Sequence, residues 1–157
     1  MKTIKALLID SRNGTIKEII LNQVDGCFLT DMYKSLDCRF VEVIRNSIDG
    51  SNNDIWIDDE GATEEAKSFF MPTHQDYTDA QYWIAGNGLI AGHDLETGET
   101  TDHTLAKEDI EKLCDSMKIM NSNSIPKIDD WQKKGVFKML SFFYPGESGQ
   151  NKNDNKT

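Results

Sequence analysis

The start of the chain decides the fold, because residues 3–21 read TIKALLIDSRNGTIKEIIL. The aliphatic runs on both sides of a polar centre predict two strands, over residues 3–10 and 15–21. The centre contains Asn13-Gly14, a dipeptide that supplies positive φ at both central positions of a tight hairpin turn. The stretch therefore predicts a β-hairpin, from which the remaining elements are placed.

Helix and strand patterns alternate after this hairpin. Apolar side chains in residues 28–36 fall on one face of a short helix. Strands are predicted over residues 40–44 and 54–58, with a polar loop between them. The apolar segments 82–85 and 89–92 are separated by glycines, so they form either a hairpin or one strand broken by a bulge.

The second half of the chain contains one clear helical pattern. Apolar residues recur every three or four positions over residues 107–120, and Thr104 is the expected N-cap of this helix. One or two helical turns are predicted over residues 63–70. The apolar residues of 131–144 fit a helix or a strand.

Together these patterns predict a single α+β domain. It has an antiparallel sheet of about five or six short strands, with two or three helices packed on one side. Residues 1–120 form the core domain, and residues 121–145 form a C-terminal extension that packs on the core or on a partner. Residues 146–157 form a disordered polar tail. A chain of 157 residues is long enough to bury such a core without disulfides or metals.

The composition excludes several classes of function. The chain has 27 acidic and 17 basic residues and a net charge of −10. Direct binding to nucleic acid or to an anionic membrane is not expected, since both need clustered Lys and Arg. No segment approaches the roughly 20 apolar residues of a membrane helix. The three cysteines, Cys27, Cys38 and Cys114, are odd in number and include no CxxC pair, so we expect free thiols and a cytoplasmic location.

The negative charge is concentrated in two stretches. Residues 54–79 have eight acidic side chains and one lysine, and residues 94–115 have eight acidic side chains and two lysines. If both stretches share a face, that face can imitate a polyphosphate and occupy a basic groove on a partner protein. The alternative is a solubilising surface. The candidate partner-binding residues are Asp58, Asp59, Glu60, Glu64, Glu65, Glu108, Asp109 and Glu111.

A second hypothesis is a small-ligand module, such as a sponge for a cyclic nucleotide. Its phosphates would bind the arginines of the first third of the chain, since arginine pairs with phosphate through two parallel hydrogen bonds. An aromatic ring would stack on the base. The candidate ligand-binding residues are Arg12, Arg39, Arg45 and Trp83.

A third hypothesis is a metal-dependent enzyme, with Mg²⁺ or Ca²⁺ bound by Asp58, Asp59 and Glu60. Consecutive strand residues point to opposite faces, so these carboxylates do not converge without a turn, and a solvated turn is the favoured interpretation. The three histidines are His74, His93 and His103, and their spacing matches no zinc motif. We expect no catalytic residue, metal or cofactor.

Four segments in this order resemble a family of small uncharacterised proteins of bacteriophages, plasmids and other mobile elements. They are the opening hairpin, MYKSLDC over residues 32–38, IWIDDEG over 55–61 and GNGLIAGHDLETGE over 86–99. The resemblance covers about residues 4–115. It implies an accessory factor that acts on host machinery, including host defence, and it implies no enzymatic role for any residue.

The resulting hypothesis is a non-catalytic mobile-element protein that acts by binding a host protein with a basic groove. The chain departs from the family pattern in its C-terminal part, from about residue 120. The aromatic and aliphatic residues of 131–144 are either core or a surface for self-association, so a homo-oligomer formed through them is a further prediction.

Overall fold

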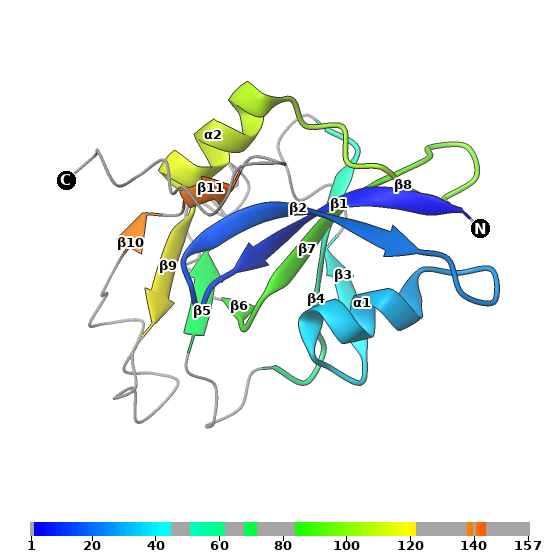
Figure 1. Cartoon of the computed structure of the whole chain (residues 1–157), viewed down its shortest axis with the longest axis horizontal. Coiled ribbons are helices and arrows are strands. Elements are labelled where there is room, and N and C mark those ends of the chain that lie inside the picture. Colours follow the sequence, from blue (N-terminus) through cyan, green and yellow to red (C-terminus); the bar gives the residue numbers. More distant parts are fainter. Residues whose placement is uncertain are drawn as a thin grey trace.

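The computed structural model describes residues 2–44, 51–61, 68–71, 84–121, 138–139 and 141–143. It has an α+β fold with short strands and two helices in these residues (Figure 1). In chain order the elements are β1 (Thr3–Asp10), β2 (Thr15–Asn22), α1 (Leu29–Leu36), β3 (Val41–Ile44), β4 (Asn53–Asp58), β5 (Ser68–Met71), β6 (Ile84–Ala85), β7 (Gly88–His93), β8 (Thr100–Thr101), α2 (Lys107–Ser116), β9 (Lys118–Asn121), β10 (Lys138–Met139) and β11 (Ser141–Phe143).

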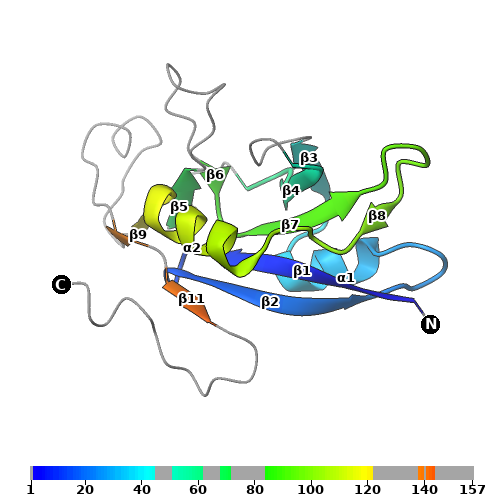
Figure 2. The same ribbon diagram turned by 90° about the horizontal axis from the view of Figure 1, so that it is seen from above.

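The main sheet has the strand order β11-β2-β1-β7-β4-β3, and β8 pairs with the end of β7, beyond the residues of β7 that pair with β1. Its neighbours are antiparallel except β11, which pairs with β2 in parallel. A smaller antiparallel sheet has the order β10-β9-β5-β6. Figure 2 shows β5, β6 and β9 together at one end of the main sheet, beside α2. The predicted α+β class with an antiparallel sheet of about six short strands is confirmed.

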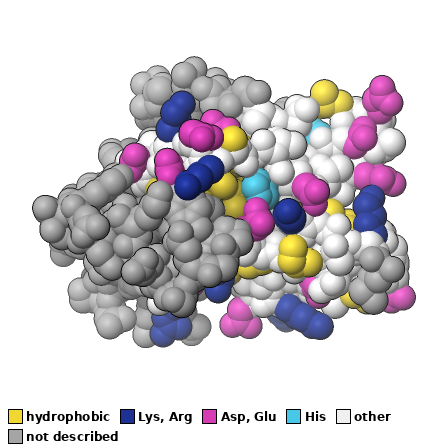
Figure 3. Space-filling model, turned by 45° about the horizontal axis from the view of Figure 1, so that its top comes forward, with side chains coloured by type: hydrophobic (Ala, Val, Ile, Leu, Met, Phe, Trp, Pro, Cys, Tyr) yellow, Lys and Arg dark blue, Asp and Glu magenta, His cyan; other side chains and the backbone are white. Residues whose placement is uncertain are grey.

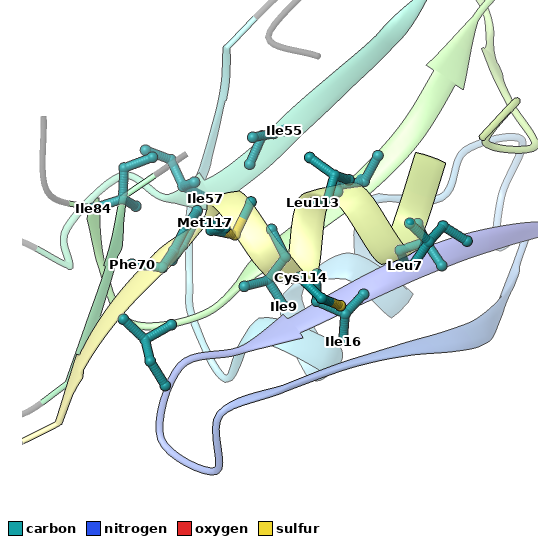
Figure 4. Packing of buried hydrophobic residues seen from close by; sticks show 13 residues of the cluster. Leu7, Ile9, Ile16, Ile55, Ile57, Phe70, Ile84, Leu113, Cys114 and Met117 are labelled. Carbon is teal, nitrogen blue, oxygen red and sulfur yellow. The ribbon is translucent and has the colours of Figure 1, made fainter. Parts of the chain in front are cut away.

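The two helices cover opposite faces of the main sheet, so the prediction that helices pack on one side is wrong. On one face, Ile110, Leu113, Cys114 and Met117 pack against the sheet around Ile9 (Figure 4). On the other face, the side chains of the α1 region pack against Ala6, Leu8, Leu89 and Ala91. The helices cover both faces because the central strand β1 is apolar on both sides. Its consecutive residues 6–9 are all buried. A strand that is apolar on both faces needs cover on both.

The first hairpin has a longer turn than Asn13-Gly14 alone predicts. Asp10 pairs with Thr15, so four residues form the turn, and only Gly14 among them has positive φ. The backbone N–H of Gly14 donates to the carbonyl oxygen of Asp10 at 2.8 Å. Ser11 is fully buried, and its hydroxyl contacts Ser68 Oγ at 2.8 Å and the Gly86 carbonyl oxygen. The longer turn therefore lets Ser11 join the hairpin to the smaller sheet.

The helix predicted over residues 107–120 ends at Ser116. Met117 has extended backbone angles, and the next residues form β9, which pairs with β5. Met117 and Ile119 are both buried, which is the alternation of a strand.

Thr104 is not the N-cap of α2, because the helix is capped at Ala106. The Thr104 hydroxyl instead accepts a hydrogen bond from the fully buried Asn53 side chain at 2.8 Å, which joins this segment to β4.

One further correction concerns residues 63–70, and residues 131–144, which fitted a helix or a strand, contain strands where they are described. Residues 68–71 form strand β5 instead of a helical turn, because Phe69 and Phe70 are both buried between its neighbours. Five residues of 131–144 form strands β10 and β11, which pair with β9 and β2. Residues 63–67, the remainder of 122–145, the tail over 146–157 and the loop at 45–50 lie outside the described residues. Among the described residues, neither helix has the length and apolar character needed to cross a bilayer.

Candidate functional site

The first predicted acidic group forms a tight turn at the end of β4. The Asp58 carboxylate accepts the backbone N–H of Glu60 at 2.9 Å, and the N–H of Gly61 donates to the Asp58 carbonyl oxygen at 3.1 Å. Glu60 pairs with Arg39, whose Nη2 donates to both of its carboxylate oxygens at 3.0 and 2.9 Å. One of the three negative charges is therefore balanced locally. Glu64 and Glu65 lie outside the described residues.

This turn changes the chemistry of a neighbouring thiol. The pKa of Cys38 is raised above its ordinary value of 9.0, first by burial and then by the negative charge of Asp58. A thiol with a raised pKa carries less thiolate near neutral pH, and the thiolate is the nucleophile. Cys38 is therefore poorly suited to nucleophilic catalysis. Cys114 is buried among the side chains of α2 on the opposite face.

The second acidic group lies on α2. Glu108 and Asp109 are exposed in its first turn, where carboxylates interact favourably with the helix dipole, and Glu111 is half-buried. Asp109 also caps the helix, since its Oδ2 accepts the backbone N–H of Ala106 at 3.1 Å. The apolar side of α2 faces the core through Ile110 and Leu113. The packing of the helix thus fixes which of its residues point outward.

More acidic side chains lie between β7 and α2. Asp94, Glu96, Glu99 and Asp102 are all exposed. The pKa of Asp94 is lowered below its ordinary value of 3.8, mainly because its carboxylate accepts the backbone N–H groups of Thr97 and Glu96. Figure 3 shows acidic side chains both over α2 and at the edge of the molecule formed by this turn. We call the acidic side chains of residues 94–115 together the 94–115 surface.

Within the described residues, the structure does not bring the turn at residues 58–60 together with the acids of α2. Ile55 and Ile57 of β4 face α2, whereas Trp56 packs on the α1 side, so the alternation along β4 directs Asp58 to the α1 side. The start of α2 lies near Asn53, at the opposite end of β4 from Asp58, through the Asn53–Thr104 hydrogen bonds. The turn at 58–60 and the acids of α2 thus differ in both face and strand end.

The predicted ligand-binding arginines do not define a phosphate site in the described residues. Arg12 is exposed in the turn between β1 and β2, and Arg39 is held by Glu60. Arg45 and Trp83 lie outside the described residues.

The hypothesis of a metal enzyme gains no support from the turn at residues 58–60. Across the described ranges, no three His, Cys, Asp or Glu side chains gather as a metal site would require.

Two buried histidine–carboxylate pairs are absent from the sequence-based candidates. His93 Nδ1 lies 2.9 Å from Asp54 Oδ2, with only 11% and 1% of the two side chains exposed. His103 Nε2 lies 2.8 Å from Glu18 Oε2. The backbone N–H of Leu105 donates to His103 Nδ1, so Nε2 is the protonated nitrogen that donates to Glu18.

The Asp54–His93 pair joins β4 to the end of β7, and the His103–Glu18 pair joins the segment before α2 to β2. An acidic residue within an apolar strand is the signal that points to Asp54, since buried acids need a partner. The sequence does not identify which histidine supplies it. Both pairs connect elements of the fold.

These features define a small α+β protein with an acidic surface and two buried histidine–carboxylate pairs. The chain belongs to the DUF3846 family, described as a domain of unknown function, whose family model matches residues 4–117. The matched region contains both helices and most of the main sheet, and it ends at the residue that follows α2. Comparison with curated proteins and with solved structures gives no match.

Proposed function

We propose that this protein acts without catalysis, by binding, and that the 94–115 surface occupies a basic nucleic-acid groove on a host protein. The observation that carries the proposal is the placement of charge along this surface. Of its eight acidic residues, seven are exposed, and four of the eight lie on α2, whose apolar side is fixed in the core. The acids of α2 are therefore presented on a rigid support.

The composition of the 94–115 surface supports a basic partner. Its cations are Lys107 and Lys112, so the surface keeps a net negative charge. A concentrated field of one sign steers an oppositely charged partner and raises the association rate more than the affinity. Such attraction is screened by salt, because the Debye length is about 10 Å at 0.1 M ionic strength. Binding should therefore weaken steeply as salt is added.

The turn at residues 58–60 is not part of this proposed surface. It lies on the other face of the sheet, and Arg39 balances Glu60. The proposal thus keeps Glu108, Asp109 and Glu111 from the sequence-based set and adds the acids of residues 94–102. This division provides an internal control, since Asp59 is an exposed acid in the turn at residues 58–60, at the opposite end of β4 from the start of α2.

The biological context rests on the resemblance in motifs. The hairpin, the DDEG turn and the glycine-rich segment resemble proteins carried by bacteriophages, plasmids and other mobile elements. We propose that this protein has the same origin and acts on host machinery, with a host defence protein as the target. A bacterial cytoplasmic location follows from this role.

Charge reversal at matched sites tests the proposal. The wild-type chain, Glu108→Lys and Asp59→Lys are immobilised and exposed to lysate of a bacterial host, and bound proteins are eluted with a salt gradient. We expect a partner that elutes at low salt, is lost with Glu108→Lys and is kept with Asp59→Lys. Equal loss with both variants, or elution that is independent of salt, would contradict the proposed surface.

A further inference from the structure

We propose that a cavity beside α1 binds a free aromatic amino acid as a zwitterion. The cavity has a volume of about 280 Å³ and lies between the first turn of α1, strand β4 and the turn before β8. It is on the α1 face of the main sheet, away from the acids of α2, and Glu99 at its rim also belongs to the 94–115 surface. This site does not depend on the proposed function.

The size of the cavity limits the ligand. Small-molecule sites commonly measure about 300–1,000 Å³, so this cavity is at the small end of the range. It accommodates a single ring with a short polar part, and it is too small to enclose a dinucleotide. Among the described residues that line it, there is none of the arginines that a phosphate group would need.

The interior of the cavity favours an aromatic side chain. Phe28, Leu29, Met32 and Trp56 provide its apolar lining. Aromatic rings pack well edge-to-face or offset against Phe and Trp, and the thioether of methionine makes favourable contacts with ring edges. Burial of one ring in such a lining is the main source of affinity for a ligand of this size.

Charge complementarity at the rim favours a zwitterion. Lys2 Nζ lies 3.9 Å from Glu99 Oε2, and both residues line the cavity with exposed side chains. A ligand with only a carboxylate would meet Glu99, and a ligand with only an ammonium group would meet Lys2. An amino acid places its carboxylate against Lys2 and its ammonium group against Glu99. Because α1 begins at the cavity with Leu29, its dipole also favours the carboxylate.

The walls of the cavity are held in place before a ligand arrives. Trp56 is on β4 and Thr100 pairs with His93 of β7, and the buried Asp54–His93 pair joins these two strands. A site whose walls are already ordered loses less entropy on binding. The Asp54–His93 pair therefore contributes to the shape of the cavity without contacting the ligand.

Protection of Cys27 from alkylation tests this site directly, because Cys27 is exposed and lines the cavity. The full-length protein is treated with iodoacetamide, with and without L-phenylalanine at about 10 mM, a concentration that detects weak binding. Mass spectrometry follows Cys27 and Cys38 separately. We expect L-phenylalanine to slow alkylation of Cys27 several-fold and to leave Cys38 unchanged. No protection of Cys27, or equal protection of both thiols, would overturn the proposal.

Ligand analogues and charge variants test the zwitterion. Phenylalaninamide lacks the carboxylate, and 3-phenylpropionate lacks the ammonium group. We expect each to bind about ten-fold more weakly than L-phenylalanine, the usual effect of losing one charge-assisted hydrogen bond. Lys2→Gln should abolish the preference over the amide, and Glu99→Gln should abolish the preference over 3-phenylpropionate. Equal binding of all three ligands, or protection by adenosine monophosphate alone, would contradict the assignment.

Discussion

Asp54 and His93 form a buried pair, with 2.9 Å between Oδ2 and Nδ1, that joins β4 to the end of β7. Removing one partner leaves the other buried without its hydrogen bond. We expect Asp54→Ala to lower the free energy of unfolding by about 3 kcal/mol, as for other broken buried pairs. Urea denaturation measures this loss. Asp59→Ala, an exposed control, should change the free energy of unfolding by less than about 0.5 kcal/mol. Equal effects of the two variants would show that the buried pair does not contribute to stability.

Gly88 allows β7 to pack closely against Phe70 of the smaller sheet. A Cβ atom placed on Gly88 would lie 2.7 Å from Cζ of Phe70, closer than packed atoms approach. We expect Gly88→Ala to destabilise the protein by about 1–3 kcal/mol, the usual cost of overpacking. Phe70→Leu shortens the opposing side chain, so the double variant should lose less stability than the two single changes predict together. Additive losses, measured by thermal or urea unfolding, would show that these residues do not clash.

The three cysteines should react in a fixed order. Cys27 is exposed, Cys38 is half-buried with a raised pKa, and Cys114 is buried in the core. We expect alkylation at pH 8 to modify Cys27 first, Cys38 second and Cys114 only after unfolding, because the thiolate is the reactive form. Asp58→Asn removes a nearby negative charge, which should lower the pKa of Cys38 and speed its reaction. An unchanged rate would show that Asp58 does not influence this thiol.

The Asp94 carboxylate should stabilise its turn only when it is ionised. Hydrogen bonds from the backbone N–H groups of Thr97 and Glu96 lower its pKa in the folded protein below the ordinary 3.8. The stabilisation is therefore present above pH 3.8 and is lost as the pH falls through the lower, folded-state pKa. We expect carboxyl ¹³C NMR to show a titration midpoint below 3.8 for Asp94. The stability difference from Asp94→Asn should shrink over the same pH range, and a midpoint at or above 3.8 would refute these hydrogen bonds.

Local patterns in the sequence predict where helices and strands form. They predict less well how these elements pack against one another. The hairpin of β1 and β2, helix α1 and strand β4 follow from the period of their apolar residues. The end of α2 does not, because Met117 fits both the helical period and the buried alternation of a strand. Pairing of β9 with β5 resolves this ambiguity, and that pairing joins residues about 50 positions apart.

The same contrast applies to the functional surfaces: neighbours in the chain are predicted from the sequence, and contacts between distant strands are not. The acids of residues 94–115 follow one another in the chain, so the sequence identifies them as one group. The turn at 58–60 has a similar composition, but the alternation of β4 and the position of Thr104 beside Asn53 separate it from α2. The Asp54–His93 pair and the cavity also depend on contacts between distant strands, which no spacing in the sequence shows.

Displacement of nucleic acid from the captured host protein tests the central claim most directly. A fluorescent oligonucleotide is bound to that protein, and its anisotropy is followed as this protein is added. The account predicts displacement by the wild-type chain and by Asp59→Lys, a weaker effect at higher salt, and little displacement by a Glu96→Lys, Glu108→Lys double variant. Failure of the wild-type chain to displace the oligonucleotide, or full displacement by the double variant, would contradict it.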